Sequence, residues 1–155
     1  MSLVSCIMAD MQYTMMTSDC EDKAANITAK LKSVTEQGSD LGKLISGLEN
    51  ELDQAKYAFR ELDSAKWSLS SSQDPRAQQF MGVAEQRQAY CQQRYAELGQ
   101  RKQQMECEKR RLMAQEKELT AQQKANEVMQ KFSTAAAEKF GKMIDPAIKR
   151  FFGQG

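Results

Sequence analysis

The sequence predicts an all-α protein, a long antiparallel α-helical hairpin or coiled coil with amphipathic N- and C-terminal helices. Three observations lead to this prediction. Apolar residues alternate at steps of three and four over residues 24–69. The 155-residue chain contains only two prolines, Pro75 and Pro146, and one serine-rich turn sequence, SSSQDP, at 70–75. Its abundant Ala, Glu, Gln, Lys, Leu, Arg and Met are typical of long helices.

The first predicted element is a methionine-rich amphipathic segment at 1–20. Its apolar residues keep helical spacing, and they are Val4, Ile7, Met8, Met11 and Met15. We expect either a helix or a segment that becomes ordered when it meets a partner. Methionine side chains are flexible and polarizable, so a surface built from them adapts to several partners.

A long heptad helix is predicted at 21–69. Two columns of residues repeat every seven positions. The first column is Ala24, Leu31, Gly38, Ile45, Leu52, Phe59 and Lys66, and the second column is Ile27, Val34, Leu41, Leu48, Ala55, Leu62 and Leu69. Only Gly38 and Lys66 interrupt the apolar pattern. Such a pattern predicts the seam of a coiled coil or hairpin. The seam residues on which we rely most are Leu31, Ile45, Leu48, Leu52, Phe59 and Leu62.

A turn is predicted at 70–74, followed by a second long helix at 75–145. Asp74 is placed to cap that helix, and Pro75 suits the first helical position because its missing N–H costs nothing there. One apolar column persists along the helix, comprising Ala84, Cys91, Leu98, Met105, Leu112 and Leu119. Asp145-Pro146 repeats the capping pattern, which predicts a kink or a separate short basic amphipathic segment at 146–155, stopped by Gly153.

Folding the chain at this turn places residue i opposite residue 144−i and brings the two chain ends together. The first 21 residues contain three acids and no base, whereas residues 123–155 contain six bases and three acids. Opposite charges at the two ends favour their contact, although exposed pairs contribute little individually. We expect a terminal assembly face formed by Ile7, Met8, Met11, Val128, Phe132, Phe140, Met143, Ile144 and Phe151.

An arginine column, Arg87, Arg94 and Arg101, repeats every seven residues beside the apolar column of the second helix. Nucleic-acid binding is disfavoured because residues 75–122 mix nine bases with six acids, and the whole chain has a net charge of +1. We therefore place these arginines in a half-polar seam that also contains Cys91, Leu98 and Met105. Their carboxylate partners are acids of the first helix, Glu49 and Glu51 for Arg94 and Asp53 and Glu61 for Arg87, or acids of a neighbouring subunit.

No residue is predicted to be catalytic, to bind a cofactor or to bind a metal. The chain has no histidine, which removes the usual general base and the usual metal ligand. Its four cysteines form no CxxC pair and are interpreted as small apolar packing residues. We expect no enzymatic activity and no cofactor.

The predicted function is that of a non-enzymatic structural protein, a hairpin subunit that self-associates into a bundle or filament. The partner is another copy of the chain, in a homo-oligomer or homopolymer, or a different helical protein. In helical layout and amphipathic ends the chain resembles secreted filament and needle subunits of flagellar and type III secretion systems. This likeness carries over no individual residue. We expect the chain to be synthesised in the cytoplasm without a cleavable signal peptide. The resemblance implies that it is then exported by a leaderless route.

Two alternative functions use the chain ends. The stretch KFGKMIDPAIKRFF, 139–152, is basic and amphipathic with terminal aromatics, which suits binding to a membrane surface. The competing interpretation buries that face against residues 1–20 or another subunit, and we favour burial. The second alternative is an adaptor or chaperone-like binder that uses the methionine-rich residues 1–16.

Overall fold

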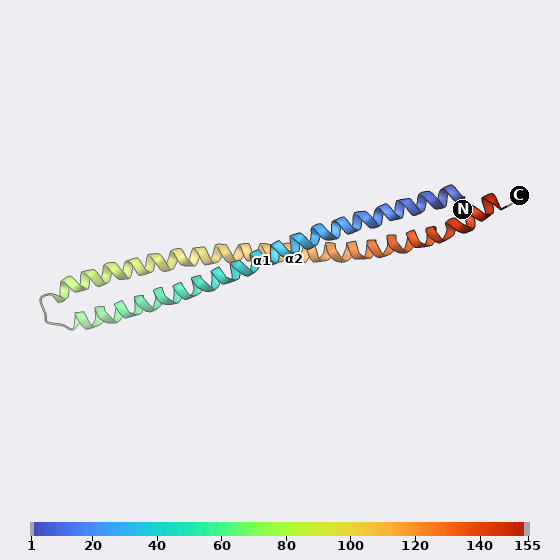
Figure 1. Ribbon diagram of the computed structural model, residues 1–155. Helices are drawn as coiled ribbons and strands as arrows, with labels where there is room; N and C mark the ends of the chain where they lie inside the picture. Colours follow the sequence, from blue (N-terminus) through green and yellow to red (C-terminus); the bar gives the residue numbers. More distant parts are fainter. Residues whose placement is uncertain (1, 154–155) are drawn as a thin grey trace. The chain divides into compact units, whose positions relative to one another are not determined.

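The computed structural model describes residues 2–153, and it forms a helical hairpin. Helix α1 covers Leu3–Ser70 and helix α2 covers Ala77–Phe152, and the two pack against each other in antiparallel directions (Figure 1). Within the described residues there is no strand. The predicted all-α hairpin is therefore confirmed.

Two compact units make up the chain. The loop unit comprises Glu36–Met113 and contains the connection between the helices. The termini unit comprises Met1–Thr35 and Ala114–Gly155, and there the first part of α1 lies beside the last part of α2. Each unit is thus a pair of antiparallel helical segments with its own seam.

Local hydrogen bonds explain where the helices begin and end. At the start of α1, the Ser5 amide donates to the Ser2 hydroxyl over 3.2 Å. At its end, the Ser70 hydroxyl donates to the Trp67 carbonyl over 2.7 Å and so satisfies one of the last helical acceptors. Asp74 caps the following turn, because its carboxylate accepts from the Arg76 amide over 2.9 Å.

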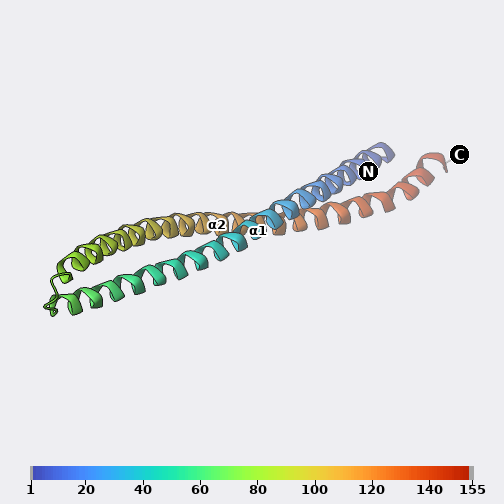
Figure 2. The same ribbon diagram turned by 60° about the vertical axis from the view of Figure 1, so that its left-hand side comes forward.

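The helix boundaries correct three predicted ones. Residues 1–20 do not form a separate element, because α1 is continuous from Leu3 to Ser70. The loop extends past the predicted end at 74, and α2 begins at Ala77 rather than at Pro75. Pro146 lies inside α2, which curves towards its end but continues to Phe152, so 146–152 is not a separate helix (Figure 2). Residues 154–155 of the predicted segment lie outside the described residues.

The heptad pattern of α1 extends through the whole helix. Both predicted columns continue towards the N-terminus. The column of Ala24 continues through Thr17, Asp10 and Leu3, and the column of Ile27 continues through Cys20, Tyr13 and Cys6. Every residue of both columns from Leu3 to Leu69 is buried or half-buried. A repeat of 3.5 residues keeps the same face towards a partner helix over this length.

Candidate interaction surfaces

The seam of the loop unit is mainly apolar. Its most buried side chains come from both helices and are Ile45, Leu48, Ala55, Ala77, Ala84, Leu98 and Leu112. The predicted seam residues Leu52, Phe59, Leu62, Cys91 and Met105 are half-buried in the same seam. Leu31 of α1 and Leu119 of α2 are half-buried at seam positions of the termini unit.

The arginine column lies outside the hairpin seam, which corrects the predicted half-polar seam. Arg87, Arg94 and Arg101 are all exposed. The second seam column of α2 is displaced by one residue from the arginines, and it contains Met81, Gln88, Tyr95, Lys102 and Lys109. Gln88 can be buried at the helix contact because an uncharged amide needs only hydrogen-bond partners, whereas a guanidinium also needs a counter-charge.

One arginine of the column does reach an acid of the same chain. Arg94 Nη2 lies 3.4 Å from Glu51 Oε2, between two exposed side chains. This is the intramolecular pairing that the sequence suggested as one of two possibilities. Other pairs show that the register is shifted: Glu49 pairs with Lys102 at 3.3 Å, whereas the rule 144−i places residue 95 opposite Glu49.

Polar side chains bridge the helices next to the loop-unit seam. The Lys66 ammonium donates to Gln88 Oε1 over 3.1 Å, and Gln88 Nε2 donates to Asp63 Oδ1 over 3.2 Å. Lys102 contacts Glu49 across the seam and Glu106 on its own helix, at 3.3 and 3.8 Å. Lys66, Gln88 and Lys102 therefore each have a polar partner on the other helix.

The termini unit has a different seam, in which small and polar residues are buried. Asn126 donates through Nδ2 to the Cys20 carbonyl over 2.7 Å. The Thr17 hydroxyl donates to Ser133 Oγ over 2.9 Å, and Ser133 is 0% exposed. Closer to the chain ends, the Tyr13 ring stacks on the Phe140 ring, with 5.7 Å between the ring centroids. Sequence analysis missed Asn126 and Ser133, although they continue the seven-residue column of Leu112 and Leu119.

The predicted terminal assembly face is divided by the structure. Phe140 and Ile144 are half-buried at seam positions of α2. The remaining members point away from the seam or flank it and are exposed, and they are Ile7, Met8, Met11, Val128, Phe132, Met143 and Phe151. Tyr13 reaches the exposed Phe132 edge-on, with ring centroids 5.9 Å apart.

Two outward apolar stripes result on the termini unit. The methionine stripe is Val4, Met8, Met11 and Met15 of α1, spaced so that all four lie on the helix face opposite the seam. Met8 and Met15 are 66% and 67% exposed. The second stripe lies on α2 and comprises Ala121, Ala125, Val128 and Phe132, all exposed.

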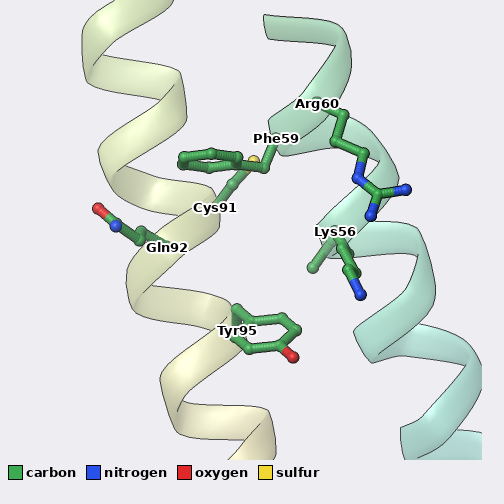
Figure 3. Close-up of a pocket in the computed structure, with 7 residues that line it drawn as sticks. Lys56, Phe59, Arg60, Cys91, Gln92 and Tyr95 are labelled. Carbon is green, nitrogen blue, oxygen red and sulfur yellow. The ribbon is translucent and has the colours of Figure 1, made fainter. Parts of the chain in front are cut away.

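A hollow of about 380 Å³ lies beside the seam of the loop unit. Its lining residues come from both helices and are Ala55, Lys56, Phe59, Arg60, Cys91, Gln92 and Tyr95. Figure 3 shows the Phe59 ring extending from α1 over Cys91, and the Tyr95 ring extending from α2 towards α1. Side chains do not fill the seam here because Ala55 and Cys91, which occupy its central positions, are small.

The residue types needed for metal chemistry do not gather in the described part of the chain. Among residues 2–153 there is no group of three or more Cys, Asp or Glu side chains that could hold a metal ion. Nor does any described helix combine the length and the apolarity that a membrane span requires.

Tyr57 has a raised pKa. The Tyr57 hydroxyl donates to Glu61 Oε1 over 2.7 Å, one turn along the exposed side of α1. This hydrogen bond and the negative charge of Glu61 raise the pKa of Tyr57 above its usual value of 10.0, because ionised tyrosine would face the carboxylate.

Comparison with known proteins gives no match to a family model, to a curated protein or to a solved structure.

Proposed function

We propose that the protein is a non-enzymatic structural protein whose hairpins associate with one another through the outward apolar stripes of the termini unit. The observation that carries this proposal is the exposed apolar face of α1 in residues 3–20, on the side opposite the seam. The face of α1 that contacts α2 includes Asp10 and Thr17, whereas the opposite face presents Val4, Met8, Met11 and Met15. A contiguous exposed apolar surface of this kind is typical of a protein interface.

The energetic reason is the hydrophobic effect. Full burial of one methionine or valine side chain contributes about 1.5–3 kcal/mol, so covering one stripe is a substantial driving force. Part of that gain offsets the loss of translational and rotational freedom on association. Helix-on-helix packing through such a stripe is the usual way in which bundles grow.

Charge complementarity favours a second copy of the chain as the partner. In the termini unit, residues 3–35 of α1 contain four acids and three bases, and residues 114–152 of α2 contain seven bases and five acids, so the two helices have small net charges of opposite sign. Among the described residues, every ion pair lies in the loop unit. The charges of the termini unit are therefore available to a neighbouring copy, with α1 of one chain facing α2 of the next.

The test is the mass of the protein in solution over a wide range of concentration, by sedimentation velocity and light scattering. We expect the parent chain to associate, and we expect the triple variant Met8→Gln/Met11→Gln/Met15→Gln to remain smaller at equal concentration. The matched control replaces three exposed apolar side chains of the loop unit, Leu44→Gln/Val83→Gln/Met113→Gln. A parent chain that stays monomeric at every concentration contradicts the proposal, as does a methionine variant that associates like the parent.

A second candidate function is binding to an anionic membrane surface through the end of α2. Phe151 and Phe152 are 72% and 74% exposed, and Lys149 and Arg150 beside them are exposed as well. Aromatic side chains next to bases are typical of segments that lie in the lipid headgroup region. Exposure of the two phenylalanines is the observation that favours this candidate over burial against residues 1–20.

Vesicle flotation distinguishes the two candidates. If the membrane candidate is right, the chain floats with anionic vesicles and not with uncharged ones. The variant Phe151→Ser/Phe152→Ser then stays at the bottom of the gradient, while the control Phe80→Ser/Tyr90→Ser, altered at exposed loop-unit aromatics, still floats. A parent chain that ignores anionic vesicles eliminates this candidate and leaves self-association untouched.

A further inference from the structure

We infer that the hollow beside Ala55 in the loop unit is a binding site for a small organic carboxylate with an apolar tail. The inference concerns a surface on the loop unit and is independent of self-association through the termini unit. Three features carry it: an apolar hollow with aromatic walls, two adjacent cations without counter-ions, and a hydroxyl on the opposite helix.

The apolar part of the site follows from the seam. Ala55 is buried and occupies a position of the heptad where the preceding and following heptads have Leu48 and Leu62. The missing side-chain volume leaves the hollow open to solvent, with Phe59 and Tyr95 on either side (Figure 3). Its volume of about 380 Å³ falls in the range of small-molecule sites.

The cations are Lys56 and Arg60, one helical turn apart on α1. Like charges at this spacing repel each other. Among the described residues neither takes part in an ion pair, although Asp53 and Asp63 lie within one turn of them along the helix. Asp63 instead accepts a hydrogen bond from Gln88. An anion bound between the two cations removes their repulsion.

The opposite edge of the hollow supplies no competing negative charge. Its lining residues on α2 are Cys91, Gln92 and Tyr95. In Figure 3 the Tyr95 hydroxyl lies on the side of the hollow that faces α1, where it can donate to a bound oxygen. Elsewhere along the seam a base on one helix pairs with an acid on the other, as Lys102 of α2 pairs with Glu49 of α1.

These features select the ligand class. A carboxylate suits the site because the planar guanidinium of Arg60 can donate two parallel hydrogen bonds to it, and Lys56 adds a second positive charge. An aliphatic or aromatic tail suits the side chains of Ala55, Phe59 and Tyr95. Two cations are too few for the several phosphates of a nucleic acid. A medium-chain fatty acid such as decanoate is therefore the probe of choice.

The first experiment is titration calorimetry of the full chain with decanoate below its micelle concentration, with decan-1-ol as the uncharged comparison. We expect decanoate to bind, and the alcohol to bind more weakly by about tenfold or more because it lacks the charge. The variant Lys56→Gln/Arg60→Gln should lose about the same factor. The control Arg110→Gln/Lys117→Gln removes two exposed charges elsewhere and should bind like the parent. Equal binding of acid and alcohol, or an unchanged Lys56→Gln/Arg60→Gln variant, overturns the inference.

The second experiment locates the ligand without altering charge. Cys91 lines the hollow, whereas Cys107 is exposed and does not line it. Decanoate should slow alkylation of Cys91 by iodoacetamide and leave the rate at Cys107 unchanged, as measured by peptide mass spectrometry. The variant Ala55→Leu fills the hollow with the side chain found at the same position of the neighbouring heptads, so it should keep its helicity and lose decanoate binding. Unchanged alkylation of Cys91, or normal binding by a helical Ala55→Leu variant, contradicts the site.

Discussion

The loop unit and the termini unit are built from the same two helices, yet their seams differ in polarity. In the loop unit the most buried seam positions are mainly apolar, as at Ile45, Leu48, Leu98 and Leu112. In the termini unit Asn126 and Ser133 are buried, as are Cys6 and Cys20, while the methionine stripe faces outward. The comparison teaches that a continuous heptad fixes which face is buried but does not fix what that face contains. The content of the seam decides whether a segment is stable within the hairpin or needs another surface.

The largest expected effect comes from the apolar seam. Leu98 is only 3% exposed, so Leu98→Ala should lower the free energy of unfolding by about 2–4 kcal/mol through lost burial and the cavity left behind. Ser133→Ala in the termini unit should cost about 1 kcal/mol or less, since it removes little apolar surface. Urea unfolding followed by circular dichroism measures both, with the exposed Leu44→Ala as control. Equal costs at Leu98 and Ser133 would contradict the difference between the units.

The next largest effect is a gain in stability accompanied by a less well defined register between α1 and α2. Asn126→Leu replaces a buried amide by an apolar side chain, so it should raise the free energy of unfolding by about 1 kcal/mol. The Asn126 hydrogen bond to Cys20 no longer defines the alignment in this variant. Its register can be followed by oxidation of a Thr17→Cys/Ser133→Cys pair, with the native cysteines replaced by alanine. We expect rapid disulfide formation with Asn126 present and slower formation with leucine. A destabilised leucine variant would show that the amide is essential for packing.

A smaller effect is expected for the ion pair that joins the helices of the loop unit. Arg94 and Glu51 are about half exposed at a separation of 3.4 Å, so water and salt screen their attraction. Arg94→Gln and Glu51→Gln should each cost about 0.5 kcal/mol or less, and the coupling between them should vanish at high salt. A double-mutant cycle in urea at two salt concentrations measures this coupling. A coupling that exceeds about 1 kcal/mol would mean that this exposed pair contributes to stability on the scale of a buried seam residue.

The sequence was sufficient for the fold because the signals were long and local. Alternation over residues 24–69 defined the seam of α1, and Asp74 with Pro75 located the turn. The site was harder to predict. At the N-terminus the spacing of the methionines predicts an apolar face, whereas extending the heptad backwards from Ala24 selects Thr17 and Asp10 for the seam. In α2 two columns one residue apart can accompany Cys91 and Leu98, namely the arginine column and the column of Gln88 and Tyr95 that the structure contains.

The hollow at Ala55 could not be predicted for a different physical reason. It depends on which side chains of α1 and α2 meet, and the true register differs from the one inferred from the turn. A six-residue loop, 71–76, separates the helices, so neighbouring side chains are displaced along the seam relative to a fold at 70–74. A seven-residue column identifies a helix face, but only the register shows that Ala55 and Cys91 share one layer.

The smallest expected effect concerns an outward polar pair of the loop unit, and it appears at high pH. The hydrogen bond and the charge of Glu61 raise the pKa of Tyr57 above 10.0. A pKa that is higher in the folded chain contributes stability that is fully present below the unfolded pKa and is lost as the pH rises through the folded value. Spectrophotometric titration of tyrosine should therefore show one late-ionising group, which returns towards the ordinary range in Glu61→Gln. Since this pair lies in solvent, the variant should change stability at neutral pH little compared with Leu98→Ala. If Tyr57 ionises with the other tyrosines in the parent chain, the contact with Glu61 is not maintained in solution.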